Sequence, residues 1–189
     1  MREEEVIEIF EKQGALLKGH FKLSSGLHSE KYLQCALILQ YPKIAEKLSK
    51  GLAARFSSEK IDVVIGPALG GIVLSYEVGR TLGVRSVFTE REERKMVLRR
   101  GFSIAKGEKA LVVEDVITTG GSTKEVIDVV KNSGGIVVGV GSIIDRSDAI
   151  IDFDVRKESL AKLQIKTFNP NSCPLCQAGI PVTKPGSRA

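Results

Sequence analysis

Two adjacent carboxylates, Glu114 and Asp115, directly precede a run of small and hydroxyl-bearing residues in the stretch LVVEDVITTGGST, residues 111–123. Such a loop can turn its backbone amides toward a phosphate, and the helix expected next adds unpaired N–H groups and a favourable dipole. Carboxylates beside that phosphate can accept hydrogen bonds from ribose hydroxyls. The stretch therefore predicts a phosphorylated-sugar site, with the phosphate held by Thr118, Thr119, Gly120, Gly121, Ser122 and Thr123.

A simpler explanation exists for each part of this stretch. Acidic residues at strand ends are often merely solvated, and the loop could be an ordinary strand-to-helix turn with Ser122 or Thr123 as the N-cap. The stretch is not a Walker loop, because no Gly-Lys-Ser/Thr follows, and it lacks the Gly-x-Gly-x-x-Gly pattern of dinucleotide-binding folds. The acidic pair placed directly before the loop favours the binding site.

A second glycine-rich turn, GPALGG at residues 66–71, also follows an apolar strand and precedes a helix. Its backbone amides could bind a second anion. Taken alone, the turn fits an ordinary connection equally well.

Both loops depend on apolar strands that alternate with helices. Strands are expected at the start of residues 61–71, over 84–90, from 109 into the loop, and over 136–145. Helices are expected over residues 3–13, 42–56, 72–82 and 122–132. This alternation indicates a parallel sheet covered on both faces, where ligands bind beyond the carboxyl ends of the strands. The acidic pair is expected where its strand leaves the sheet.

The strand, acidic pair and Thr-Gly loop resemble the phosphoribosyl pyrophosphate signature of type I phosphoribosyltransferases, and the resemblance spans about residues 6 to 188. It implies an α/β fold: a parallel-sheet core with helices on both faces and a small strand-rich hood. It implies that Glu114 and Asp115 hold the ribose hydroxyls and that Thr118 to Thr123 hold the 5′-phosphate. The pyrophosphate would be held by Ala68, Leu69, Gly70 and Gly71.

The implied activity is transfer of a phosphoribosyl group to a base nitrogen, with release of pyrophosphate. The implied cofactor is Mg²⁺, held mainly by substrate and water without direct protein ligands, since this ion usually keeps several waters. No covalent nucleophile is needed, and the sequence shows no Ser-His-Asp or Cys-His arrangement. Catalysis would rest on positioning and charge stabilisation.

Several segments are similar to the branch of this family that uses orotate in pyrimidine nucleotide biosynthesis. Residues 19–39 resemble its hood, and the resemblance places Tyr32, Leu33 and Thr118 at the base. Arg146, after the strand at 136–145, matches an arginine that pairs with the orotate carboxylate, which a guanidinium can bind in a two-pronged fork. A surface salt bridge is the plain alternative for Arg146.

The charged segment EREERKMVLRRG, residues 90–101, has no clean apolar periodicity and predicts an exposed, mobile loop. In the family, this loop closes over the pyrophosphate of the neighbouring subunit. Arg91 and Lys95 match its basic positions and would act as catalytic residues together with Asp115. The resemblance thus implies a homodimer with shared active sites. A solvated loop without such a role is the alternative.

The three cysteines are too few for a disulfide framework and indicate a reducing, cytoplasmic setting. Cys173-x-x-Cys176 suggests zinc, but one pair supplies two of the four ligands a structural site needs, so a surface turn is favoured. Cys35, His20 and His28 could complete the set only by chance. The acidic N-terminus does not resemble a signal peptide, and no apolar stretch is long enough for a membrane span.

The net charge of +5 is compatible either with a solvated basic surface or with an anionic ligand. Nucleic acid is not expected as a partner, because the chain has no Trp, three Tyr and no block of like charges. Two rival functions remain: a phosphoribosyltransferase for a purine base, and a regulator that binds phosphoribosyl pyrophosphate without turnover. The second would usually carry a DNA-binding domain, and no basic helix-turn-helix is present.

The chain is expected to form one domain over residues 1–189, with a core at about 42–150. The hood is expected mainly from residues 15–40 together with 155–189. Two positions depart from the family pattern, because many members carry lysine where this chain has Ser24 and Gly70. Amides of Gly70 and Gly71, Lys22 or the basic loop could compensate for the missing charge.

Overall fold

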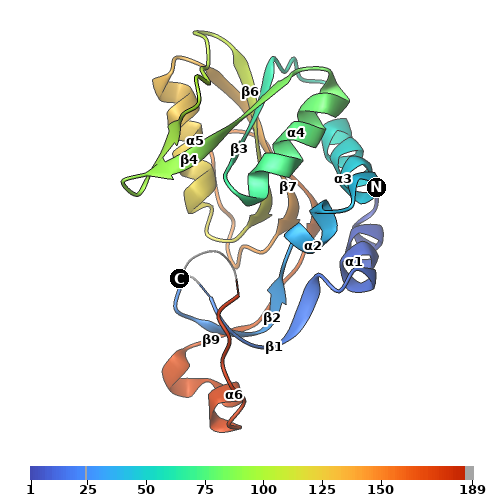
Figure 1. Ribbon diagram of the computed structural model, residues 1–189, viewed down its shortest axis with the longest axis vertical. Helices are drawn as coiled ribbons and strands as arrows, with labels where there is room; N and C mark the ends of the chain where they lie inside the picture. The colour runs from blue at the N-terminus through green and yellow to red at the C-terminus, as the bar shows by residue number, and fades with distance from the viewer. Residues whose placement is uncertain (24, 186–189) are drawn as a thin grey trace.

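A six-stranded sheet organises the computed structural model, which describes residues 1–23 and 25–185 (Figure 1). Neighbouring strands run parallel except for the antiparallel pair β4 and β5. In sheet order the strands are β5 (Lys95–Leu98), β4 (Arg85–Glu92), β3 (Val63–Pro67), β6 (Lys109–Ile117), β7 (Ile136–Asp145) and β8 (Lys157–Lys162). The predicted α/β class with a parallel core sheet is confirmed.

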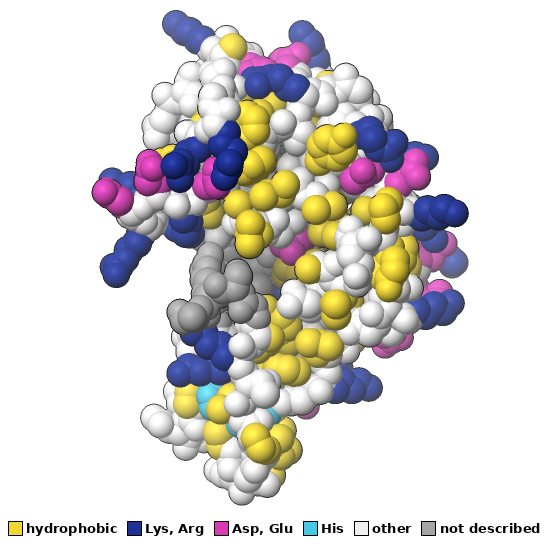
Figure 2. All heavy atoms as spheres, viewed as in Figure 1, with side chains coloured by type: hydrophobic (Ala, Val, Ile, Leu, Met, Phe, Trp, Pro, Cys, Tyr) yellow, Lys and Arg dark blue, Asp and Glu magenta, His cyan; other side chains and the backbone are white. Residues whose placement is uncertain are grey.

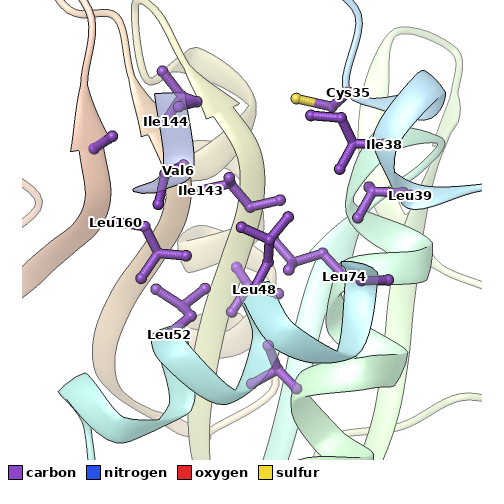
Figure 3. Packing of buried hydrophobic residues seen from close by; sticks show 14 of the residues in the cluster. Val6, Cys35, Ile38, Leu39, Leu48, Leu52, Leu74, Ile143, Ile144 and Leu160 are labelled. Atoms are coloured by element: carbon purple, nitrogen blue, oxygen red, sulfur yellow. The ribbon is translucent and has the colours of Figure 1, made fainter. Parts of the chain in front are cut away.

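Helices cover both faces of this sheet because its central strands are apolar on both sides. On β6, Leu111 and Val113 belong to one buried cluster, whereas Ala110 and Val112 belong to another. The first cluster packs under α1 (Glu3–Lys12), α3 (Pro42–Arg55) and α4 (Gly70–Leu82), and the second packs under α5 (Gly121–Asn132). Figure 3 shows the first cluster at the labelled residues Val6, Leu48, Leu52, Leu74 and Ile143.

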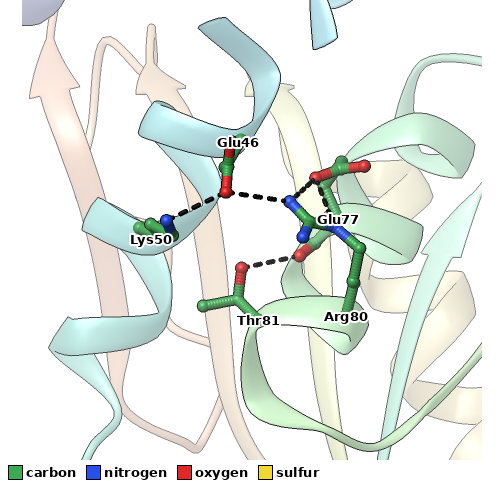
Figure 4. A network of polar contacts seen from close by, with 5 residues as sticks. All are labelled: Glu46, Lys50, Glu77, Arg80 and Thr81. Carbon is green, nitrogen blue, oxygen red and sulfur yellow. Dashed lines mark hydrogen bonds and ion pairs between the residues drawn. The ribbon is translucent and has the colours of Figure 1, made fainter. Parts of the chain in front are cut away.

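Polar contacts on the surface join α3 to α4 (Figure 4). Glu46 on α3 pairs with Lys50 at 2.9 Å and with Arg80 of α4 at 3.4 Å, while Arg80 also donates to Glu77 at 2.8 Å. Exposed pairs of this kind contribute about 0–1 kcal/mol each. The orientation of α4, whose first turn borders the candidate site, therefore rests mainly on the buried cluster.

A small antiparallel sheet forms the predicted hood at one end of the molecule (Figure 1). Its strand order is β1 (Leu16–Lys22), β2 (His28–Leu33) and β9 (Thr167–Phe168). Short helical segments accompany it: α2 (Ala36–Leu39), the 3₁₀ turn η1 (Pro170–Ser172) and α6 (Pro174–Gln177).

One boundary of the expected hood needs correction. Residues 157–162, assigned there as part of 155–189, form β8 and pair with β7 in the six-stranded sheet. Leu160 and Ala161 are buried in the core cluster beneath α1 and α3, which holds this strand against the core.

No helix in the described part of the chain is both long enough and apolar enough to cross a bilayer.

Candidate active site

The acidic pair lies within β6, not beyond its end as the sequence predicted. Glu114 and Asp115 precede the last residue of the strand, Ile117, which still pairs with β7. On the other side, β3 pairs with β6 only as far as Val112. Past that point the edge of β6 toward β3 opens into a crevice, so the carboxylates reach a ligand site without leaving the strand.

Asp115 is held by its own backbone and by close packing. Its Oδ1 accepts a hydrogen bond from the N–H of Val116 at 2.9 Å. A Cβ added to Gly70 would lie 2.5 Å from Asp115 Oδ2, so the carboxylate occupies the space that a side chain at position 70 would need. A side chain at position 70 would therefore require the Asp115 carboxylate to move. The other departure, Ser24, lies outside the described residues.

Cys35 is buried beside the acidic pair. Burial raises the pKa of its thiol well above the ordinary value, and the charges of Asp115 and Glu114 raise it further. The thiol therefore stays protonated beside Asp115. Glu114 is itself 9% exposed and accepts from the N–H of Asp115 at 3.3 Å. Both carboxylates are thus fixed before any ligand arrives.

The loop after β6 leads directly into α5, as predicted. Gly120 is the N-cap, and no side chain caps the helix. The alternative of a turn capped by Ser122 or Thr123 is therefore wrong. The uncapped first amides of α5 remain available to an anion at the carboxyl end of β6.

Gly120 is required at this N-cap for two reasons. Its φ is +73°, in the left-handed region, and an added Cβ would lie 3.0 Å from Phe153 and 3.1 Å from Ile151. Gly121, the next residue, has an ordinary φ, and its nearest neighbour would be Thr119 Oγ1 at 3.7 Å.

We expect Gly120→Ala to lower the melting temperature clearly more than Gly121→Ala. The left-handed conformation alone costs an L-residue about 1–2 kcal/mol, equivalent to about 2–8 °C for a chain of this size. Thermal unfolding of both variants beside the wild type measures the difference. Equal melting temperatures would contradict the strained geometry assigned to Gly120.

The second loop, between β3 and α4, faces the first across the crevice. The N-cap of α4 is Leu69, and no side chain caps this helix either. Ala68, Leu69 and Gly70 line the crevice, as predicted. Gly71 does not: it packs against Gly66 and Pro67, where an added Cβ would lie 2.8 Å from the proline ring. Gly71 therefore shapes the turn.

The crevice forms two adjoining cavities. The larger cavity, about 830 Å³, is lined by the acidic pair, residues 118–123 and the 67–70 loop. The smaller cavity, about 550 Å³, lies toward the hood. Both are bordered by Tyr32, Gln34, Asp115, Val116, Thr118 and Thr119.

Arg146 lines the smaller cavity from the loop after β7. Its backbone N–H donates to the carbonyl of Ile117 at 2.7 Å, which fixes the residue beside the end of β6. Its Nε is buried and has no hydrogen-bond partner. Burial lowers the pKa of its guanidinium. The described residues include no salt bridge to Arg146, so the surface ion pair considered from sequence is wrong, and a buried donor is left for a ligand.

Two predicted residues of the hood also border the smaller cavity. Tyr32 lies between the two cavities, whereas the buried Leu33 borders the smaller one. Burial and the charge of Asp115 raise the pKa of the Tyr32 phenol, which therefore stays neutral. Together, Tyr32 and Leu33 offer an apolar surface in the cavity that Arg146 also lines.

The segment 90–101, predicted as a mobile loop, begins as an ordered β-hairpin. Glu92 pairs with Lys95 around a two-residue turn, and Met96 is buried at 6% exposure. Arg91 donates to both carboxylate oxygens of Glu125 on α5 at 3.0 and 2.9 Å. The hairpin projects from the side of the sheet, with basic and acidic side chains mixed on its surface (Figures 1 and 2).

Neither Arg91 nor Lys95 lines either cavity of its own chain. The structure therefore brings together the predicted residues of β6, of the two loops except Gly71, and of the hood, but it leaves Arg91 and Lys95 of the hairpin outside both cavities.

Sequence reasoning missed Lys184 and Asp148 as cavity residues, and it named Lys22 only as a source of charge. All three line the smaller cavity. Lys184 comes from the C-terminal segment, 38 positions beyond Arg146, and no local pattern marks it.

The chain is similar to proteins of known family over nearly its whole length. Residues 37–168 match the phosphoribosyl transferase domain. An orotate phosphoribosyltransferase from Caldanaerobacter subterraneus subsp. tengcongensis is 62% identical over 188 residues, covering 100% of this chain and 99% of that protein.

Solved structures share the fold. The crystal structure of orotate phosphoribosyltransferase from Aeropyrum pernix is 26% identical, with a TM-score of 0.71, over 84% of this chain and 93% of that one. An adenine phosphoribosyltransferase from Thermoanaerobacter pseudethanolicus is 19% identical, with a TM-score of 0.60, over 70% of this chain and 88% of that one. The similarity to this adenine phosphoribosyltransferase shows a shared fold and nothing more.

Proposed function

Because this chain belongs to the orotate phosphoribosyltransferases of the type I phosphoribosyltransferase family, it transfers a phosphoribosyl group to orotate, and we propose that the larger and smaller cavities together form its active site. The observation that carries this proposal is Arg146, which lines the smaller cavity and whose buried Nε has no hydrogen-bond partner. This cavity adjoins the larger one, which contains the phosphate loop. Orotate bears a carboxylate, and a guanidinium that has an unused donor is complementary to it.

Phosphoribosyl pyrophosphate occupies the larger cavity. Its 5′-phosphate accepts hydrogen bonds from the loop of Thr118 to Thr123 and from the uncapped start of α5. Its ribose hydroxyls donate to Glu114 and Asp115. Its pyrophosphate faces Ala68, Leu69 and Gly70 at the uncapped start of α4. The 5′-phosphate and the pyrophosphate thus each lie at the N-terminus of a helix, and the ribose hydroxyls lie beside carboxylates.

Orotate occupies the smaller cavity. Its carboxylate pairs with Arg146, its ring packs beside Tyr32 and Leu33, and Thr118 borders the junction with the sugar. Since Asp115 and Thr118 line both cavities, the base nitrogen and the ribose carbon meet there.

Mg²⁺ fits this site as a partner of the substrate. Within the described ranges, the only group of three or more His, Cys, Asp or Glu close enough to hold a metal lies in the hood, so the acidic pair is not part of a protein cage. Binding through substrate phosphates, waters and few carboxylates is the usual arrangement for this ion. When bound, Mg²⁺ would neutralise charge on the pyrophosphate oxygens.

The reaction is a substitution at the anomeric carbon of ribose. The bond from this carbon to the pyrophosphate oxygen breaks, and its electron pair leaves with pyrophosphate. The orotate nitrogen forms the new bond and gives up its proton, yielding orotidine 5′-phosphate. The ribose ring gains oxocarbenium character, as in glycoside hydrolysis. The fixed carboxylates of Glu114 and Asp115 lie where they can stabilise that positive charge.

The β4–β5 hairpin serves the active site of a second copy in a two-fold dimer. Lys95 is exposed at the start of β5 and lines neither cavity of its own chain. The hairpin that carries it projects from the side of the sheet (Figure 1). Arg91 is engaged with Glu125, so Lys95 is the better placed of the two to reach a neighbour's pyrophosphate. The two-fold dimer is the commonest closed assembly.

Free cysteines support the proposed cytoplasmic setting.

Base selection tests the assignment against a purine phosphoribosyltransferase and against a non-catalytic regulator. Orotate, adenine and hypoxanthine are each incubated with the protein, phosphoribosyl pyrophosphate and Mg²⁺, and nucleotide products are separated. Only orotidine 5′-phosphate is expected. A purine nucleotide as the main product, or tight substrate binding with no product, would contradict the account.

Replacing Asp115 with Asn is expected to raise the Michaelis constant for phosphoribosyl pyrophosphate while preserving the fold. A charged hydrogen-bond partner of the ribose is lost, at a cost of about 1.5–3 kcal/mol. The matched control is Asp128→Asn, which makes the same change at an exposed position of α5 outside both cavities. Steady-state kinetics of both variants measures the effect. Asp115→Asn kinetics equal to those of the control would refute the role given to Asp115.

A further inference from the structure

Four side chains with metal-binding atoms converge in the hood. They are His20 on β1, His28 on β2, Cys173 and Cys176, and we call them the His/Cys cluster. Their ligand atoms all lie within 4.8 Å of one another. The sequence favoured a surface turn for the two cysteines, but Cys173 is 1% exposed, and the fold supplies two further ligands from 145 or more positions away. Figure 2 shows histidine atoms at this end of the molecule.

The spacing of these atoms approaches the edges of a coordination tetrahedron. Zinc bonds of about 2.3 Å to sulfur and about 2.0–2.1 Å to nitrogen give edges of about 3.6 Å between unlike atoms and about 3.3 Å between nitrogens. Cys173 Sγ and Cys176 Sγ lie 3.6 and 3.7 Å from His20 Nε2, and Cys176 Sγ lies 3.3 Å from His28 Nδ1. The two nitrogens lie 2.8 Å apart, at hydrogen-bond distance, so binding of the ion requires them to move apart by about 0.5 Å.

The hydrogen bonding of His20 prepares it as a ligand. Its Nδ1 lies 2.7 Å from the carbonyl oxygen of Ile180, which can only accept, so Nδ1 carries a proton. In the neutral ring, Nε2 then presents a lone pair to the cluster. Metal-bound histidines are typically oriented in this way, by a second ring nitrogen that donates to a carbonyl or carboxylate.

The segment around the cysteines has no hydrophobic core of its own. Among the described residues, neither buried cluster includes one beyond Ile165, and α6 buries no residue, while Ile180 and Val182 are 43% and 48% exposed. Backbone hydrogen bonds between Thr183 and β1 are among its few contacts with the hood. Segments too small to bury a core are commonly held by a metal or by disulfides, and these cysteines are free.

We propose that His20, His28, Cys173 and Cys176 bind one Zn²⁺ in a structural site that fastens the C-terminal segment to the hood. Two thiolates and two imidazoles form a ligand set that suits zinc. Four protein ligands leave no open position, so the ion has a structural role and no catalytic one. The same segment carries Lys184 to the smaller cavity, so the metal also fixes one wall there. The site stands on its own geometry and does not depend on the transferase assignment.

Metal analysis of the purified full-length protein tests the proposal. About one zinc per chain is expected in the wild type. Cys176→Ser should reduce the content to near zero; because Cys176 is exposed, this variant should still fold. Cys35→Ala is the matched control, since Cys35 is the one cysteine outside the cluster, and it should retain the metal. Cobalt added to metal-free protein should give the visible d–d bands and thiolate charge-transfer band of a tetrahedral site, and Cys176→Ser should give neither.

Two readouts separate a structural metal from an adventitious one. Removing zinc with a chelator should lower the melting temperature and speed protease cleavage in the segment after Phe168, and restoring zinc should reverse both. Folded wild-type protein that binds neither zinc nor cobalt, or that contains a Cys173–Cys176 disulfide, would overturn the proposal. Equal loss of zinc from Cys35→Ala and Cys176→Ser would also overturn the proposal. The same holds if the rate of protease cleavage after Phe168 does not change when zinc is removed.

Discussion

Lys95→Ala is expected to lower turnover by orders of magnitude while substrate affinity changes little. The charge on the pyrophosphate oxygens grows as the bond to ribose breaks, so a lysine that meets them acts mainly on the transition state. Lys95 lies outside both cavities of its own chain, on a hairpin held to α5 through Arg91 and Glu125. We therefore propose that the lysine acts on a neighbouring subunit.

Steady-state kinetics of Lys95→Ala gives the size of the effect. The control is Lys131→Ala, which removes an exposed lysine from the far end of α5. A Lys95→Ala variant as active as this control would show that Lys95 has no part in the reaction.

Mixing two weakly active chains tests whether the site is shared. Lys95→Ala chains are combined with Asp115→Asn chains, so that in each mixed dimer one site collects both defects and the other collects neither. About a quarter of wild-type activity should return after random exchange, because half of the dimers are mixed and each has one intact site. No recovery, with exchange confirmed independently, would mean that the hairpin serves its own subunit.

Arg146→Ala is expected to weaken orotate binding by about 2–5 kcal/mol, the cost of leaving a buried charge without its partner. Binding of phosphoribosyl pyrophosphate should change far less, because Arg146 lines only the smaller cavity. The fold should survive, since the buried Nε makes no hydrogen bond that the substitution would break.

Calorimetry with each ligand measures both affinities, and Arg146→Lys serves as the comparison. Lysine keeps the positive charge but cannot form the two-pronged contact, so its orotate affinity should fall between those of the wild type and the alanine variant. Equal losses for both ligands would mean that Arg146 supports the structure and does not select the base.

The sequence predicted the core of the fold well, because its signals there are local. The strands that carry the site are apolar. The acidic pair directly follows the apolar residues of β6, and the glycine-rich loops begin where β3 and β6 end. Parallel strands bring their carboxyl ends to one edge, so the predicted residues of β6 and of the two loops, apart from Gly71, came together. Only the length of β6 was misjudged, because the strand remains paired with β7 after its pairing with β3 has ended.

The features that sequence reasoning missed depend on long-range contacts or weak local patterns. In the β4–β5 hairpin, the buried Met96 has charged residues around it in the sequence. The alternation of apolar and polar residues that predicts a strand was therefore not visible there. In β8, KESLAK buries only Leu160 and Ala161 at the edge of the sheet. The His/Cys cluster joins positions 20 and 28 to positions 173 and 176, a relation that only the folded hood reveals.

The absorbance of orotate, followed after phosphoribosyl pyrophosphate and Mg²⁺ are added, tests the central claim most directly. We predict that the absorbance falls with the wild-type protein and that the fall requires phosphoribosyl pyrophosphate. With Asp115→Asn at limiting phosphoribosyl pyrophosphate, or Arg146→Ala at limiting orotate, the fall should slow sharply. A wild-type protein that binds both substrates but leaves the orotate absorbance unchanged would contradict the account, as would variants that consume orotate at the wild-type rate under these conditions.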